Sequence, residues 1–186
     1  MRYTIKQRNS QLSDPFQIKS EQELMSIHIG TIGQLLELNR TMTLKFLDEI
    51  GQFEDPAAAL AYRPGPQRAH IAWQIMHIGI TEEIFATARL RTAPSDLTDW
   101  FPQYQRGSIA DNNIPSVDVI RTVLAQSRKN LLETISQIAE ADIEQIPEGL
   151  KERGWTNSMA LQIVCWHEAH HQGQAHLLLN SWKAER

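Results

Sequence analysis

The residues with the clearest capacity for chemistry are five consecutive positions near the C-terminus, His167-Glu168-Ala169-His170-His171. They lie within a long segment whose apolar residues otherwise recur at the spacing of an amphipathic helix. Burying an imidazole without a partner costs about 1–3 kcal/mol. A bound metal ion is the usual compensation when several imidazoles are buried together. The pattern therefore predicts a metal site.

The spacing of the histidines predicts which of them would bind the ion. Residues four apart on an α-helix are separated by only about 40° around its axis, so His167 and His171 share a face. His77 holds an equivalent inward place in another helical segment. Three inward imidazoles could hold one zinc-like ion and leave a coordination position open for water or substrate. The alternative is an unmetallated cluster of hydrogen-bonded core histidines.

Three neighbours of these histidines receive separate interpretations. Glu168 is a candidate general base or a hydrogen-bond partner of an imidazole, and the alternative is a helix-face glutamate with no special role. His170 is predicted at the rim of the site or behind the ligands, near enough to compete as a ligand. Cys165 should face away from His167 and is interpreted as a core thiol. As the only cysteine, it excludes an internal disulfide and favours a reducing cytoplasm.

Four amphipathic helices are predicted to position these residues, which makes the fold class all-α. Apolar residues recur at intervals of three and four, and no segment alternates with period two for long enough to form a sheet. Single-sided stripes on four helices are typical of a four-helix bundle. One bundle domain is therefore predicted over residues 21–186, after a polar N-terminal arm of residues 1–20. The predicted helices cover residues 21–50, 66–91, 116–138 and 157–183.

The connection between the second and third helices, residues 92–115, is long enough to cross the length of the bundle. These two helices would then run parallel. Long irregular loops in compact domains are often functional, so the connection is predicted to form a substrate-facing wall or lid. The alternative is a linker that merely spans the bundle. The side chains that would face the substrate are Trp100, Phe101, Tyr104 and Arg106.

Composition narrows the classes of partner. The formal net charge is −4 and no run of lysine or arginine occurs, which argues against nucleic acid as a partner. No segment has the length and apolar character of a signal peptide core or a membrane span. These features predict a soluble cytoplasmic protein with neither a nucleic-acid nor a membrane partner.

The same histidines also fit the H-E-x-x-H pattern of zinc proteases, in which the glutamate activates metal-bound water. The extended form of that motif needs glycine and histidine where this chain has Gln174 and Leu177. Too few residues follow His171 to supply a separate helix with a further ligand. The protease interpretation is therefore rejected.

Two motifs together resemble the DinB/YfiT-like superfamily of metal-dependent enzymes. They are Trp73-x-x-x-His77 followed by Glu82, and His167-x-x-x-His171-x-Gly173-Gln174. The resemblance covers roughly residues 21–183. It implies an up-down-down-up four-helix bundle that frequently dimerises and that binds a divalent metal through His77, His167 and His171.

The resemblance also implies a chemistry. Characterised relatives include thiol-dependent transferases and isomerases that use low-molecular-weight thiols. Many relatives carry arginine before the Gly-Gln pair, whereas this chain carries Gln172, which puts an anion contact at that position in doubt.

Two functional hypotheses follow. The first is a metal-dependent transferase or hydrolase that activates a thiol or water toward a small-molecule substrate, with zinc as the expected ion and nickel or iron as alternatives. The second is a non-catalytic scaffold stapled by the metal, or a stress-associated dimeric interaction protein. An open coordination position favours catalysis, whereas closure by His170 or Glu168 favours a structural ion.

Overall fold

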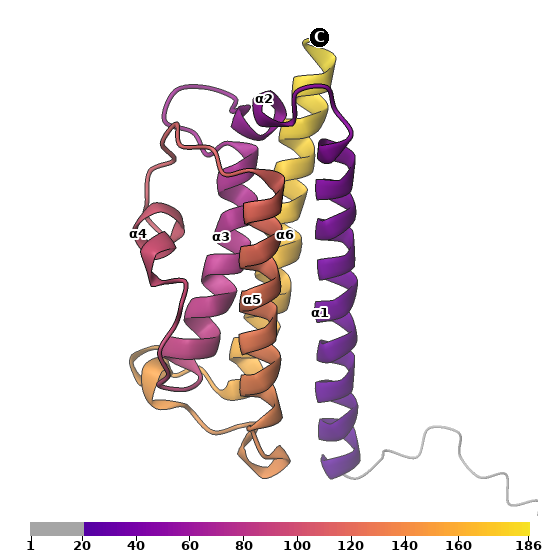
Figure 1. The fold of residues 1–186 in the computed structure, drawn as a ribbon. Coiled ribbons are helices and arrows are strands. Elements are labelled where there is room, and N and C mark those ends of the chain that lie inside the picture. The colour runs from indigo at the N-terminus through magenta and orange to yellow at the C-terminus, as the bar shows by residue number, and fades with distance from the viewer. Residues whose placement is uncertain (1–20) are drawn as a thin grey trace, which may run out of the picture.

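The structure of the protein is a computed structural model. It describes the backbone of residues 21–186 and the side chains from residue 30 onward. Four long helices lie side by side along a common axis (Figure 1). No strand occurs in residues 21–186, so the all-α prediction is confirmed. The predicted arm, residues 1–20, lies outside the described residues. The long helices are α1 (Glu21–Gly51), α3 (Ile71–Ile84), α5 (Val117–Ser136) and α6 (Asn157–Ala184).

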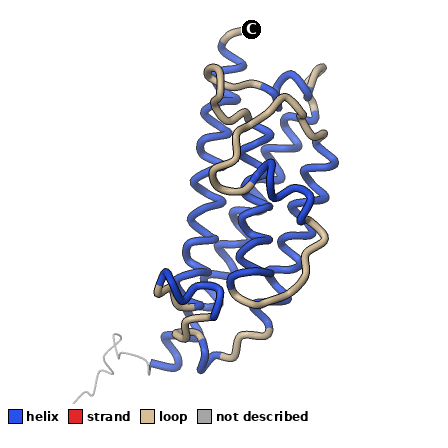
Figure 2. Tube along the Cα trace, turned by 90° about the vertical axis from the view of Figure 1, so that its left-hand side faces the viewer, coloured by secondary structure: helices blue, strands red, loops and turns tan. Residues whose placement is uncertain are grey.

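The helices run in two directions. In Figure 1, α1 and α6 rise toward the end of the bundle that holds the C-terminus, whereas α3 and α5 descend from it. Helix α3 packs against both α5 and α6, and α1 packs mainly against α6. The connection between α3 and α5 returns along the outside of the bundle (Figure 2). None of the helices in residues 21–186 combines the length and apolar character that a membrane crossing requires.

Helix starts follow their capping residues. Ser116 caps α5 and Thr156 caps α6, since each hydroxyl accepts a hydrogen bond from the backbone N–H three residues later. The predicted start of the second long helix at Pro66 is wrong. Gln67 adopts a φ of 60°, which ends any helical path there. Helix α3 begins at Ile71 instead, capped by the ring of His70.

Short elements occupy the connections, and sequence periodicity did not reveal them. The segment after α3 continues as a π-turn, η1, over Phe85–Arg89. Such turns are frequent at functional sites. The others are α2 (Pro56–Ala61), η2 (Thr98–Trp100), α4 (Phe101–Tyr104), η3 (Glu140–Asp142) and η4 (Glu148–Arg153).

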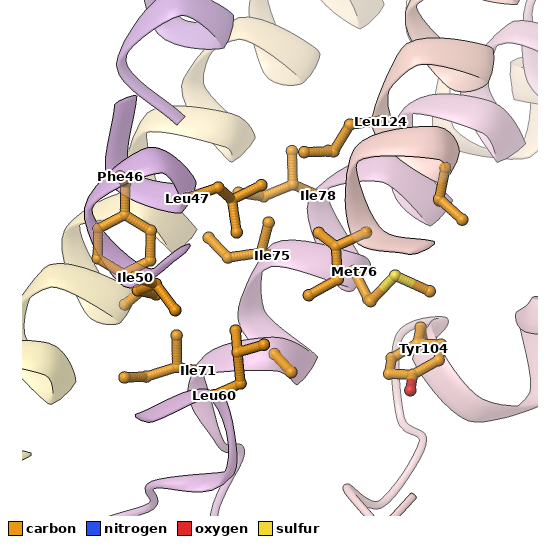
Figure 3. Packing of buried hydrophobic residues seen from close by; sticks show 14 of the residues in the cluster. Phe46, Leu47, Ile50, Leu60, Ile71, Ile75, Met76, Ile78, Tyr104 and Leu124 are labelled. Atoms are coloured by element: carbon orange, nitrogen blue, oxygen red, sulfur yellow. The ribbon is translucent and has the colours of Figure 1, made fainter. Parts of the chain in front are cut away.

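The apolar core is divided into two clusters. The larger lies toward the C-terminal end of α1, where Phe46, Leu47 and Ile50 pack against Ile75 of α3 (Figure 3). The smaller lies toward the other end and includes Leu36, Leu131 and Val164. Each long helix carries a buried charged residue between the positions that belong to the two clusters, and four of these residues pair with one another.

These four charged residues form a buried square of ion pairs, one from each long helix. Arg40 of α1 and Arg128 of α5 each pair with both Glu82 of α3 and Glu168 of α6. The Arg40–Glu168 contact is 2.9 Å and the Arg128–Glu168 contact is 2.7 Å. Burial opposes charge on Arg40, but the two carboxylates outweigh it and raise the pKa of Arg40. The bundle is therefore joined at mid-height by charge as well as by apolar packing.

At Gly149, the backbone of η4 packs directly against the backbone of the π-turn η1. A Cβ at this position would lie 2.4 Å from the carbonyl oxygen of Ala88 and 2.8 Å from the Cα of Arg89. Gly149→Ala is therefore expected to lower the free energy of unfolding by about 1–3 kcal/mol in chemical denaturation. Gly173→Ala is the matched control, because a Cβ there meets nothing within 4 Å. It should raise stability by up to about 1 kcal/mol, and equal effects of the two changes would contradict the contact.

Candidate metal centre

The structure brings together the three histidines that the sequence predicts as ligands. His77 is buried on α3, and His167 and His171 lie one turn apart on the facing side of α6. Their ligand nitrogens all lie within 4.8 Å of one another. The Nε2 atoms of His77 and His167 are 3.2 Å apart. The three rings therefore surround a common point between α3 and α6.

The donor set fits a tetrahedral zinc-like ion. Zinc–nitrogen bonds of about 2.0–2.1 Å at tetrahedral angles place ligand nitrogens about 3.3 Å apart. The Nε2 separation of His77 and His167 matches this spacing. Three protein nitrogens leave the fourth position of a tetrahedron to another ligand.

Hydrogen bonds to the far side of two rings fix which nitrogen is available. Nδ1 of His77 donates to the backbone carbonyl of Tyr104 at 2.6 Å. Nδ1 of His171 donates to Oε1 of Gln74, also at 2.6 Å. A carbonyl oxygen only accepts, so the proton resides on Nδ1 and the lone pair on Nε2. Such partners orient ligating histidines in metal sites.

Burial keeps the rings uncharged. Desolvation, followed by the neighbouring imidazoles, lowers the pKa of His167 to about 2 and that of His171 to about 3. Desolvation also lowers the pKa of His77, against the opposing effect of its hydrogen bond to Tyr104. Since a metal ligand must be a neutral imidazole, the three rings are in the binding form at neutral pH.

The connection between α3 and α5 contacts the site on the side of His77 that faces away from α6. The ring of Trp73 stacks on His77 with centroids 4.5 Å apart. Its Nε1 donates to the carbonyl of Gln103 at 3.1 Å, which ties the connection to α3. The predicted substrate-facing role of this segment needs correction. Tyr104 is only 2% exposed and packs in the core, whereas Arg106 does line the cavity described below.

Trp100 and Phe101 are the other two side chains predicted to face the substrate. Both pack against the larger core cluster and neither lines the cavity. An aromatic side chain on a long loop is attracted to the core, and sequence alone gave no sign of which way these rings turn.

The structure places Glu168 away from the imidazoles. Its carboxylate is 2% exposed and accepts hydrogen bonds from Arg40, Arg128 and Thr43 within the square of ion pairs. Although it follows His167 directly, it lies about 100° around α6 from that residue and pairs with Arg40 of α1 and Arg128 of α5. The geometry therefore gives no support to Glu168 as a general base or as an imidazole partner.

Two further histidines and the cysteine are not part of the three-histidine cluster. His170 is exposed, stacks on Trp166 with centroids 4.8 Å apart, and lines the cavity rim. His70 caps α3 through Nδ1, and burial lowers its pKa to about 4. Cys165 is buried beside the carbonyl of Ile32, and burial raises its pKa to about 11. The prediction of a core thiol is confirmed.

A cavity of about 740 Å³ opens on the three histidines. Its wall is formed by α3, the π-turn η1, the segment after α4, η4 and α6. Apolar and aromatic side chains cover much of it, among them Phe85, Trp155 and Trp166. Small-molecule sites in proteins are commonly about 300–1,000 Å³. The predicted ligands therefore lie where a small molecule would reach them.

Comparison with known proteins gives one match. A family profile described as the DinB superfamily matches residues 35–175. This range contains the square of ion pairs and all three histidines. No curated protein and no solved structure matches the chain.

Proposed function

Because the chain belongs to the DinB superfamily, we propose that it is a metal-dependent enzyme whose His77, His167 and His171 bind a divalent ion, with zinc as the expected metal. We assign it to the transferase or hydrolase type, acting on a small molecule with a thiol or water as nucleophile. The observation that carries the proposal is the convergence of three neutral imidazoles at the floor of a cavity.

The open cavity supports an enzyme over a structural staple. Neither His170 nor Glu168 is placed to close the coordination sphere, because one stacks on Trp166 and the other lies in the ion-pair square. A divalent ion bound there would lower the pKa of a thiol or water and supply a nucleophile at neutral pH.

The protein's own residues would prepare the site for that chemistry. Gln74 and the Tyr104 carbonyl hold two rings in the ligating tautomer. The stacked Trp73 shields His77 from water on one side. Apolar walls at Phe85 and Trp155 would exclude bulk water from a bound substrate and strengthen electrostatic contacts within the cavity.

Helix directions and surface side chains support two further parts of the assignment. The directions in Figure 1 agree with the up-down-down-up bundle that the superfamily implies. Exposed apolar side chains on α1 and α6 support a homodimer, because exposed apolar patches often mark interfaces. These side chains are Leu35, Leu38, Met42, Met159, Trp166 and Leu177.

The test is metal-dependent turnover. Protein stripped with a chelator and dialysed should bind one zinc ion per chain in calorimetric titration. The zinc-, nickel- and iron-loaded forms are then compared with the stripped form, using thiol transfer to a chloronitrobenzene and hydrolysis of a nitrophenyl ester. We expect at least one reaction to accelerate only with metal. Absent zinc binding, or equal rates in loaded and stripped protein, would overturn the proposal.

A further inference from the structure

Three arginines line the cavity that opens on the histidines. Arg89 lies at the end of the π-turn η1, Arg106 follows α4, and Arg153 ends η4. They come from segments far apart in the chain. No aspartate or glutamate is among the residues that line the cavity. The cavity therefore concentrates positive charge in a chain whose formal net charge is −4.

The guanidinium groups keep most of their hydrogen-bond donors available. Within the described part of the chain, none of the three forms a salt bridge. Arg89 donates from Nη1 to the carbonyl of Gly149 at 3.2 Å. Arg153 lies over the ring of Trp155, with its guanidinium carbon 4.8 Å from the ring centroid. Each guanidinium is planar and carries five N–H donors, which suits oxygen anions such as carboxylate and phosphate.

The rest of the wall limits the kind of anion. Trp155, Trp166 and Phe85 present aromatic surface beside the arginines, so an apolar or planar portion of a ligand has a place to pack. The cavity volume of about 740 Å³ suits a small molecule rather than a polymer. Gln172, at the position where many relatives carry arginine, is not among the lining residues. Anion recognition in this chain would therefore come from other segments.

We propose that the cavity binds a small organic dianion, with either two carboxylates or one phosphate, held by Arg89, Arg106 and Arg153. The inference deepens the proposed function and rests on it for the chemistry. The arginines would hold the charged groups while the uncharged portion approaches the histidine centre. Binding of the anion itself needs no metal, so it can be measured apart from turnover.

The experiment uses metal-free wild-type protein at constant ionic strength. Succinate and phenyl phosphate are titrated by calorimetry and by tryptophan fluorescence, with succinamide and phenol as uncharged controls. Each anion should bind at least ten-fold more tightly than its control. Arg106→Gln and Arg153→Gln should each weaken anion binding by about ten-fold, because a charge-assisted hydrogen bond is lost. Arg68→Gln should have no effect, since Arg68 is exposed and does not line the cavity.

Several outcomes would overturn the inference. Equal binding of the uncharged controls would do so, as would equal weakening by Arg68→Gln. Tighter binding of a single-stranded oligonucleotide than of both anions would replace the small molecule with a polymer. Preference for succinate or for phenyl phosphate identifies the group as carboxylate or phosphate. Zinc titration of the same variants keeps the two proposals separate, since the arginine changes should leave zinc affinity unaltered.

Discussion

Arg40→Ala is expected to lower the free energy of unfolding by about 3–5 kcal/mol, one of the two largest effects predicted for this protein. The change leaves Glu82 and Glu168 buried with a single guanidinium between them. Both carboxylates are 2% exposed, so water does not replace the missing partner. Urea denaturation monitored by circular dichroism measures the loss.

The matched control is Arg121→Ala, which removes an arginine from an exposed pair with Asp48. Surface pairs of this kind contribute about 0–1 kcal/mol. If Arg40→Ala and Arg121→Ala lowered the free energy of unfolding by equal amounts, the result would contradict a stabilising role of the square.

Glu168→Gln separates the two roles discussed for this residue. If Glu168 acts as part of the square, Glu168→Gln should lower the free energy of unfolding of metal-free protein. The reason is that the change removes a buried charge that faces two arginines. As a general base, it would instead affect turnover without changing stability. The structure favours the first result.

The second large effect is the loss of metal from variants of the three histidines. A four-ligand zinc site is worth about 10–16 kcal/mol. Removing one ligand should therefore weaken zinc binding by on the order of 100- to 1000-fold. His77→Ala, His167→Ala and His171→Ala should all show this loss in competition with a fluorescent chelator. His176→Ala is the control, because His176 packs edge-on against Phe46 and does not line the cavity.

Gln74→Ala provides a graded version of the same test. It removes the acceptor that orients His171 while leaving all three ligands in place. Loss of such a partner typically reduces metal affinity about 10- to 100-fold. An effect on zinc affinity as small as that of His176→Ala would argue that His171 does not bind through Nε2.

The three ligands could be predicted from sequence because helical spacing alone places His167 and His171 on one face. The partners of the rings could not. Gln74 reaches His171 across two helices, and the carbonyl of Tyr104 approaches His77 from an irregular connection. Neither contact leaves a periodic signal, and a backbone carbonyl leaves no signal in residue type.

The buried charges were the other feature hidden from sequence reasoning. Arg40 and Arg128 sit in helices whose other charges are mostly exposed, so periodicity does not distinguish them from surface residues. Their role depends on four helices meeting at one level. The π-turn at Phe85–Arg89, which directs Arg89 into the cavity wall, is likewise a backbone irregularity that periodicity does not predict.

Helix α6 directs His167 and His171 toward His77 of α3, and Glu168 toward the arginines of α1 and α5. A slide of this helix along its axis would carry His167 and His171 away from His77, and it would also pull Glu168 out of reach of both arginines. The square of ion pairs therefore fixes the position of α6 along the axis of the bundle. His167 and Glu168 are neighbours in sequence but have different roles. The ring of His167 supplies a ligand nitrogen, and the ion pairs of Glu168 determine where along the bundle that nitrogen lies.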